Sequence, residues 1–328
     1  MNKVERIRAV LAGCRPDRAP YSFWHHFRPK ESLGQAAVQA HIRHLEEFDL
    51  DFLKVMNDHL YPWQLDGVID SAAGLKSLKK YSGDEGPFSG QLEVLKSLRE
   101  EVKDDILLTS TIFGPWTVLR LLTGPPVKKH GPPKMTFADD PRQQVLDKLV
   151  RENRKLVGET LLRIAATLAD FAKCCIEAGA DGIFLSVRDD WVDTPANGAQ
   201  TYDELVQEAD LTVLRAAARG SFNVLHVCGK PLGFKRFAGY PVHAINWADR
   251  YAGPAISQVS AWLKPAIMAG VDNLNTLVNG TPGECLAEVR DALAQAGARP
   301  LIIAPGCTYD ADLVPEENLR AICKALAV

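Results

Sequence analysis

Short apolar runs alternate along the chain with longer segments in which apolar residues recur at the spacing of a helix. Eight runs have the length and composition of buried strands: residues 19–25, 51–58, 105–113, 180–187, 222–228, 242–249, 266–273 and 300–307. Strand-like runs separated by helical segments are typical of βαβ units, in which the strands pair in parallel. We therefore predict an α/β fold, and eight such units most simply close into a (β/α)8 TIM-type barrel.

The eight runs are distributed over residues 1–328 with no internal repeat and no linker between them. We therefore expect a single barrel domain. Residues 123–141 are rich in proline and glycine and follow the third run and a short apolar helix. This segment has two interpretations, an ordinary surface loop or a mobile rim loop over the mouth of the barrel.

Composition and charge disfavour several classes of partner. Of the 328 residues, 46% are hydrophobic and 24% are charged, and the formal net charge is −3. This balance gives no support for nucleic acid or an anionic membrane as the main partner. No run reaches the ~18 apolar residues of a membrane span, and the first residues are too charged for a secretory signal. We therefore expect a cytoplasmic protein.

Polar side chains with catalytic or metal-binding chemistry recur where the predicted strands end. The positions that we select are His25, His26, Asn57, Asp58, Trp191, His226, Cys228, Asn246, Asp249, Asp272, Cys307 and Tyr309. In barrels of parallel strands, the active site forms at the carboxyl ends of the strands. We therefore expect these side chains to gather around one mouth of the barrel.

Three of these residues have the chemistry of a metal site. His226 and Cys228 lie two positions apart on one predicted strand, so their side chains point to the same side. Cys307 ends the eighth run, and its distance along the chain excludes a zinc finger but suits two strands that share one mouth. Imidazole and thiolate ligands with an open fourth position are typical of catalytic zinc.

Two other interpretations of these three residues remain open. They can be core residues, with buried thiols and a hydrogen-bonded imidazole, or Cys228 and Cys307 can form a redox disulfide. The seven cysteines are irregularly spaced and odd in number, which favours reduced thiols in the cytoplasm and disfavours the disulfide. The other cysteines are interpreted as structural: Cys14, Cys174, Cys175, Cys285 and Cys323.

Several motifs add a resemblance to a known family. "HVCG" and the later "PGC" occur in order with "RIRAVLAGCRPDRAP", "GPWTVLRLL", "EAGADGIFLS" and "GTPGECLAEVRDAL". With these motifs the chain resembles the uroporphyrinogen decarboxylase superfamily over almost its whole length. Within it, the chain is similar to the zinc-dependent methylcobalamin:coenzyme M methyltransferase branch. The resemblance implies that His226, Cys228 and Cys307 are zinc ligands.

The chain also departs from the decarboxylases of that superfamily. They carry an Arg-Gln-Ala-Gly-Arg-Tyr stretch after the first strand, which binds substrate carboxylates. Here the corresponding residues are "FWHHFRPKE", in which Arg28 is the single arginine. The eighth run ends in "GCTYD" instead of a histidine-bearing turn. Decarboxylation of a porphyrinogen is therefore disfavoured.

The resemblance implies an enzyme that moves a methyl group between a corrinoid cobalt and a thiol. The expected cofactor is zinc, the substrate a small thiol or methyl thioether, and the partner a separate protein that carries the corrinoid (methylcobalamin). Three acids are candidates for a general base or for completing the zinc shell: Asp58, Asp249 and Asp272. Candidate substrate contacts at the mouth are His25, His26, Asn57, Trp191, Asn246 and Tyr309.

Two alternative functions remain. One is a metal-free decarboxylase or lyase on the same barrel, which would stay active after chelation. The other is a non-catalytic corrinoid-binding or ligand-binding protein, which would bind without turnover.

Overall fold

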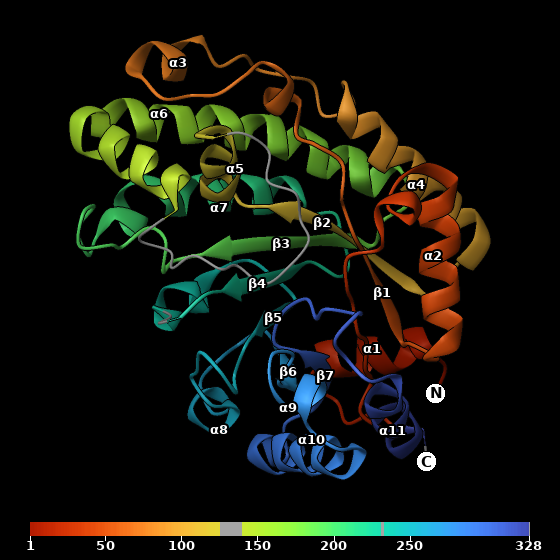
Figure 1. The fold of residues 1–328 in the computed structure, drawn as a ribbon. Helices are drawn as coiled ribbons and strands as arrows, with labels where there is room; N and C mark the ends of the chain where they lie inside the picture. Colours follow the sequence, from red (N-terminus) through yellow and green to blue (C-terminus); the bar gives the residue numbers. More distant parts are fainter. Residues whose placement is uncertain (125–139, 231–232, 328) are drawn as a thin grey trace.

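The computed structural model describes residues 1–124, 140–230 and 233–327. Seven parallel strands form one curled sheet in the order of the sequence. They are β1 (Phe52–Val55), β2 (Leu107–Phe113), β3 (Gly182–Arg188), β4 (Val224–Cys228), β5 (Ala244–Trp247), β6 (Ala266–Val271) and β7 (Leu301–Pro305). The sheet curls into a barrel with its helices outside, which confirms the predicted α/β class and barrel fold (Figure 1).

The N-terminal segment closes the barrel between β7 and β1. The amide of Ile303 donates to the carbonyl of Pro20 (2.8 Å), and the amide of Ser22 donates back to Ile303 (3.2 Å). On the other side, the amide of Asp51 donates to the carbonyl of Tyr21 (3.0 Å). This segment therefore takes the place of an eighth strand.

The predicted first strand, residues 19–25, is wrong as a regular strand. It forms only two isolated parallel bridges, Tyr21 with Ile303 and His25 with Tyr309. Pro20 has no amide hydrogen to give to a ladder, which interrupts the pairing at the start of the run. The other seven predicted runs each contain a strand, although β1 and β5 have only four residues each.

Apolar side chains fill the interior of the barrel toward the amino-terminal ends of its strands. Phe52 and Phe222 meet edge to face with ring centroids 5.2 Å apart, and Trp24 meets Phe184 in the same way at 5.3 Å. Apolar residues of the first helix, such as Ile7, join this buried cluster. The amino-terminal end of the barrel is thus packed shut, and polar chemistry is left to the other end.

Helices surround the sheet (Figure 1). They are α1 (Lys3–Leu11), α2 (Gly34–Glu47), α3 (Ala72–Ser77), α4 (Pro87–Val102), α5 (Pro115–Leu122), α6 (Pro141–Glu177), α7 (Gln207–Ala216), α8 (Ile256–Val259), α9 (Thr276–Asn279), α10 (Pro282–Ala296) and α11 (Glu316–Leu326). A second and larger apolar cluster lies between these helices and the outer face of the sheet. Short 3-10 turns and one π-helical turn, Tyr202–Val206, complete the connections.

Side-chain caps mark the starts of α6 and α10. At α10, the Thr281 hydroxyl accepts from the amide of Glu284, whose carboxylate accepts in return from the amide of Thr281. At α6, the side chain of Asp140 accepts from the amide of Arg142 (2.9 Å). Each cap satisfies amides that have no partner in the first helical turn.

Within the described residues, no helix is both long and apolar enough to cross a membrane. The segment 123–141, for which a mobile rim loop was one interpretation, lies almost entirely outside the described residues. That interpretation and the single-domain organisation both stay predictions.

Candidate metal centre

Strand β4 carries two of the three predicted ligands into the barrel. Val224 belongs to the apolar cluster of the interior, so His226 and Cys228, two and four residues later, point to the same side. His226 is 4% exposed and pairs in register with Ser186 on β3 and Asn246 on β5. The apolar floor of the barrel therefore gives way to ligating side chains at the carboxyl end of this strand.

Cys307 reaches the same place from the end of β7. The preceding residue, Gly306, donates its amide to the carbonyl of Val271 (2.9 Å) and passes close to the backbone beyond β5. A Cβ atom at position 306 would lie 2.5 Å from the Cα of Ala248. Glycine is thus required for the close approach that brings Cys307 over the mouth of the barrel.

The three side chains converge. The ligand atoms of His226, Cys228 and Cys307 all lie within 4.8 Å of one another, and the two sulfur atoms are 3.9 Å apart. Two thiolates bound at ~2.3 Å to a tetrahedral zinc would be roughly 3.8 Å apart. A disulfide requires a separation of ~2.05 Å, so these cysteines are free thiols in an arrangement that fits a metal.

Asn246 determines which nitrogen of His226 faces the other ligands. Its side-chain amide donates to the carbonyls of Met268 (2.9 Å) and Pro305 (3.1 Å), which fixes the orientation of the amide group. Its oxygen then lies 2.6 Å from Nδ1 of His226, and an amide oxygen can only accept. His226 must donate from Nδ1, which leaves the lone pair of Nε2 for a metal.

Strand β3 holds the loop that follows Cys228. Asp190, just after the strand, forms an ion pair with Arg188 (2.8 Å) and accepts from the amide of Lys230 (3.0 Å). Gly229 has φ +109°, and a Cβ there would lie 2.2 Å from an Asp190 oxygen. The glycine that ends the "HVCG" motif is therefore required both by its backbone conformation and by the carboxylate packed against it.

The two thiols do not have the same proton affinity. The pKa of Cys307 is lowered to about 6, chiefly because the Cys228 thiol donates a hydrogen bond to its thiolate; burial opposes this effect. Nearby Lys54 and Arg188 lower the pKa of Cys307 further. The pKa of Cys228 is raised by the same hydrogen bond and by burial. The contact between the two sulfur atoms thus favours loss of a proton from Cys307, and metal coordination would deprotonate both thiols.

Lys54 of β1 is a component of this region that sequence reasoning missed. Its side chain points into the barrel, is 5% exposed and lies with its ammonium 4.5 Å from the centroid of the Phe184 ring. Burial lowers its pKa to about 8, and the negative charges of the cysteines oppose this shift. The available signal was a charged residue at an inward position between Phe52 and Met56.

His26 and Asp58, two of the predicted site residues, are brought together. Nδ1 of His26 lies 2.7 Å from Oδ1 of Asp58, whose side chain is 8% exposed. The charge of Asp58 also acts on Lys54, as do the charges of Cys228 and Cys307. The His26–Asp58 pair therefore belongs to the same electrostatic environment as the ligand cluster.

Other predicted contacts also follow strand ends. His25 lies against Tyr309, two residues after Cys307, with ring centroids 5.2 Å apart. The guanidinium groups of Arg120 and Arg188 lie 4.0 and 3.5 Å from the ring of Trp191. Asn57 accepts from the amide of His59 (3.2 Å). The substrate-binding roles of these residues stay predictions, and Asn246 has the contacts of a residue that positions His226.

Asp249 and Asp272 have structural contacts. Asp249 accepts from the amide of Gly270 (2.9 Å) and pairs with Arg250 (3.2 Å). Asp272 accepts from two successive amides of the loop that follows β6, at 2.9 and 3.0 Å. Neither belongs to the ligand cluster among the described residues. Their catalytic roles stay predictions, and these contacts favour the interpretation as structural acids at strand ends.

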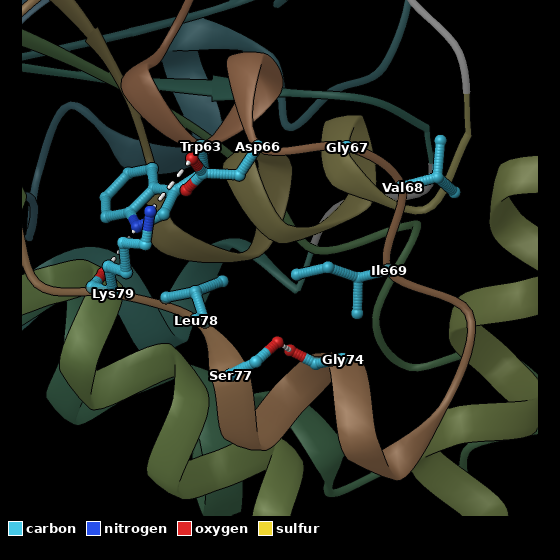
Figure 2. A pocket seen from close by; sticks show the side chains of 9 residues that line it. All are labelled: Trp63, Asp66, Gly67, Val68, Ile69, Gly74, Ser77, Leu78 and Lys79. Atoms are coloured by element: carbon cyan, nitrogen blue, oxygen red, sulfur yellow. Dashed lines mark hydrogen bonds and ion pairs between the residues drawn. The ribbon is translucent and has the colours of Figure 1, made fainter.

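A separate hollow of about 240 Å³ lies in the connection between β1 and α4 (Figure 2). It is lined by Trp63, Asp66, Gly67, Val68, Ile69, Gly74, Ser77, Leu78 and Lys79. Lys79 accounts for its main polar contacts, since its carbonyl accepts from the Trp63 indole (2.7 Å) and its ammonium pairs with Asp66 (3.5 Å). No member of the ligand cluster lines this hollow, so the candidate chemistry remains at the mouth.

Comparison with known proteins identifies a family. A model of the uroporphyrinogen decarboxylase (URO-D) family matches residues 56–327, which include all three predicted ligands. A search of curated proteins finds no significant match.

Solved structures share the fold at low sequence identity. A methyltransferase from Methanosarcina mazei is 17% identical, with a TM-score of 0.73 over 100% of this chain and 98% of its own. A candidate vitamin-B12 independent methionine synthase from Listeria monocytogenes is 12% identical, with a TM-score of 0.57 over 88% and 84%. A B12-independent methionine synthase from Shewanella sp. W3-18-1 is 14% identical, with a TM-score of 0.51 over 89% and 84%.

Proposed function

The chain belongs to the uroporphyrinogen decarboxylase family, and from that premise we propose that it is a zinc-dependent methyltransferase acting between a corrinoid cobalt and a thiol. The observation that carries the proposal is the convergence of His226, Cys228 and Cys307, with the histidine held in the tautomer that can ligate. The absence of the arginine-rich stretch and of the strand-eight histidine supports methyl transfer over porphyrinogen decarboxylation. The Methanosarcina mazei methyltransferase, which shares the fold over this whole chain, agrees with this choice.

Each residue of the cluster has a definite task in this proposal. His226, Cys228 and Cys307 would hold the zinc ion through one nitrogen and two sulfur atoms, leaving a fourth position open to the mouth. When bound, zinc supplies a Lewis-acid position at which an acceptor thiol is held as its thiolate at neutral pH. Asn246 keeps His226 in its ligating tautomer, and Asp190 keeps the loop after Cys228 in place.

The transfer step is a nucleophilic substitution at the methyl carbon. The acceptor thiol loses its proton to solvent on binding, and its sulfur then forms a bond to the methyl group. The cobalt–carbon bond of the donor corrinoid, a substrate here, would break with its electron pair remaining on the cobalt, which would be reduced from Co(III) to Co(I). The donor corrinoid would be presented at the mouth by a partner protein, and the reverse step would demethylate a thioether at the same site.

Metal analysis combined with Cys307→Ser tests the proposal. We expect about one zinc per chain in the wild-type protein, whereas Cys307→Ser should bind zinc more weakly because a hydroxyl is a poor zinc ligand. Consumption of methylcobalamin with small thiols, followed by absorbance, should fall by about tenfold or more. Thermal unfolding should change little, because an apolar core of this size does not need a metal.

Cys285→Ser is the matched control. Cys285 is a buried thiol on α10 whose sulfur lies 3.5 Å from the carbonyl of Thr276, outside the cluster. It should retain zinc and activity. Wild-type activity in Cys307→Ser would contradict the proposal, and its unfolding would indicate a structural metal. Activity that survives chelation would favour a metal-free decarboxylase or lyase, and binding without turnover would favour a non-catalytic ligand-binding protein.

A further inference from the structure

Among the residues that the structure describes, the buried cation Lys54 has no ion-pair partner. Within residues 1–124, 140–230 and 233–327, no carboxylate oxygen lies within 4.0 Å of its ammonium group. Its neighbours are the sulfur of Met56 at 3.4 Å and the rings of Phe184 and Trp24, with centroids 4.5 and 5.3 Å away. Aromatic faces and a thioether attract a cation but carry no net negative charge. An ammonium buried in this way destabilises the fold unless a further negative charge compensates it.

The nearest candidate for that negative charge is the ligand cluster. The ring of Phe184, which the ammonium of Lys54 contacts, is also stacked on His226, with centroids 5.6 Å apart and planes 28° apart. Lys54 and His226 are thus joined through one aromatic ring inside the barrel. The negative charges that act on Lys54 are those of Cys307, Asp58 and Cys228.

The net charge of the zinc-loaded cluster shows that it would not balance the positive charge of Lys54. A zinc ion with two thiolates and a neutral imidazole has no net charge, so the cluster alone does not compensate Lys54. A bound acceptor thiolate adds one negative charge. The other nearby cation, Arg188, already has Asp190 as its partner at 2.8 Å. Asp58, whose charge also acts on Lys54, is paired with His26 at 2.7 Å. Outside these two pairs, one buried positive charge remains to match the one negative charge that the acceptor brings.

We propose that Lys54 is a positioning residue whose ammonium group is the counter-charge of the acceptor thiolate in the metal centre. This inference rests on the proposed function and assigns a residue that recognises the ionised sulfur atom itself. It also explains product release. Methyl transfer converts the thiolate into a neutral thioether, the match of charges is lost, and the product is held less tightly than the substrate.

The test compares Lys54→Met with Lys155→Met. Methionine has a similar length and suits an apolar interior, so Lys54→Met removes the charge with little change in packing. Lys155 on α6 is an exposed lysine, and its substitution makes the same change in net charge far from the barrel interior. For each zinc-loaded protein we would measure zinc content, thermal unfolding, and titration calorimetry with 2-mercaptoethanol, 3-mercaptopropionate and imidazole.

Lys54→Met should keep its zinc and unfold at the same temperature as the wild type or higher, since it removes an uncompensated buried charge. Both thiols should bind about tenfold more weakly at neutral pH, because each binds as an anion. Imidazole, a neutral zinc ligand, should bind as it does to the wild type. Lys155→Met should match the wild type in every measurement.

Several outcomes would overturn the inference. Equal losses for imidazole and the thiols would show a distorted site, and a loss for 3-mercaptopropionate alone would show that Lys54 recognises a carboxylate tail. Unchanged thiol binding, or a clear fall in unfolding temperature, would also contradict it. If the wild type binds thiols at zinc but does not consume methylcobalamin, the proposed function fails while the assignment of Lys54 stands. If the wild type binds no zinc, both fail.

Discussion

Two buried charges lie three residues apart on one segment, and their surroundings differ completely. Asp51, just before β1, is fully buried and accepts from Arg6 (2.7 Å), Arg18 (2.6 Å) and the amide of Tyr21 (2.9 Å). Lys54, within β1, is nearly as buried and has two aromatic rings and a thioether beside it. The first charge is surrounded by partners, and the second is not.

The two buried charges lie at opposite ends of the barrel, and this explains why their surroundings differ. Asp51 lies at the amino-terminal end of the barrel, where the segment that closes the sheet must be joined to β1. The side chain of Lys54 faces the charges of the candidate metal ligands Cys228 and Cys307, at the end where barrels of this kind carry their chemistry. A fully partnered buried charge specifies geometry, whereas a buried charge without a partner is retained at the expense of stability and marks a functional site.

The largest effect is expected at Asp51. Asp51→Asn would leave the guanidinium groups of Arg6 and Arg18 facing a neutral amide at the barrel closure. Breaking a buried ion pair by removing one partner costs about 3–5 kcal/mol, and we expect a loss of this size in urea unfolding. Zinc content should be retained in the folded protein, because the metal centre lies at the other end.

Glu316→Gln is the control for Asp51→Asn, because it shows how much stability is lost when an exposed ion pair is broken. Glu316 pairs with Arg320 on α11, and both side chains are about half exposed. Such pairs contribute about 0.2–1 kcal/mol. If Asp51→Asn is no more destabilising than Glu316→Gln, burial and full partnering do not distinguish the structural charge, and the comparison with Lys54 loses its basis.

The next effect concerns the orientation of His226. Asn246→Ala removes the oxygen that accepts from Nδ1, so the imidazole can rotate or change tautomer. Loss of such a partner weakens metal binding by about 10–100-fold. Zinc competition with a chromophoric chelator would measure the change.

Asn318→Ala is the control for Asn246→Ala. Asn318 on α11 is fully buried and its amide also donates to two carbonyls, those of Leu277 (3.0 Å) and Gly280 (2.8 Å). Both variants should lose stability, because each leaves two carbonyls without a donor. Zinc affinity should fall only in Asn246→Ala, and an equal fall in both variants would show that zinc binding simply follows overall stability.

How far the sequence predicts a feature depends on whether that feature is set by neighbouring residues or by residues from distant segments. Seven of the eight predicted strands occur, because apolar runs between helical segments are a local pattern. The first fails because Pro20 interrupts a run whose composition alone suits a strand. The convergence of the three candidate ligands was accessible from spacing: alternation on β4 places His226 and Cys228 on one side, and the barrel brings Cys307 to them.

The surroundings of the ligands were not accessible in this way. Asn246 was selected as a substrate contact, yet its amide contacts depend on carbonyls of β6 and β7, which only the closed sheet brings together. Lys54 was overlooked because a lysine within a strand is usually exposed, and its burial depends on rings from other segments. Partners from distant segments decide these roles, and one sequence does not reveal them.

Another buried titratable group, Asp210, is an acid that has no ion-pair partner among the described residues. Asp210 on α7 is fully buried, and its carboxylate accepts from the hydroxyls of Tyr202 and Tyr240, the latter at 3.4 Å. Burial raises its pKa to about 7, and the two hydrogen bonds only partly oppose this shift. The folded protein therefore holds the proton of Asp210 more tightly than the unfolded chain does.

The sign of the resulting pH dependence follows from this difference. The contribution of Asp210 to stability is fully present below the ordinary aspartate pKa and is lost as the pH rises through about 7. Between pH 5 and pH 8 the loss should be on the order of 2 kcal/mol. Asp210→Asn, which cannot titrate, should not show it, so the stability of the wild type relative to this variant should fall over that range. Urea unfolding of both proteins at several pH values measures this difference, because the buried histidines titrate in both and cancel. Parallel pH profiles would mean that the tyrosine hydroxyls compensate the carboxylate as fully as Arg6 and Arg18 compensate Asp51.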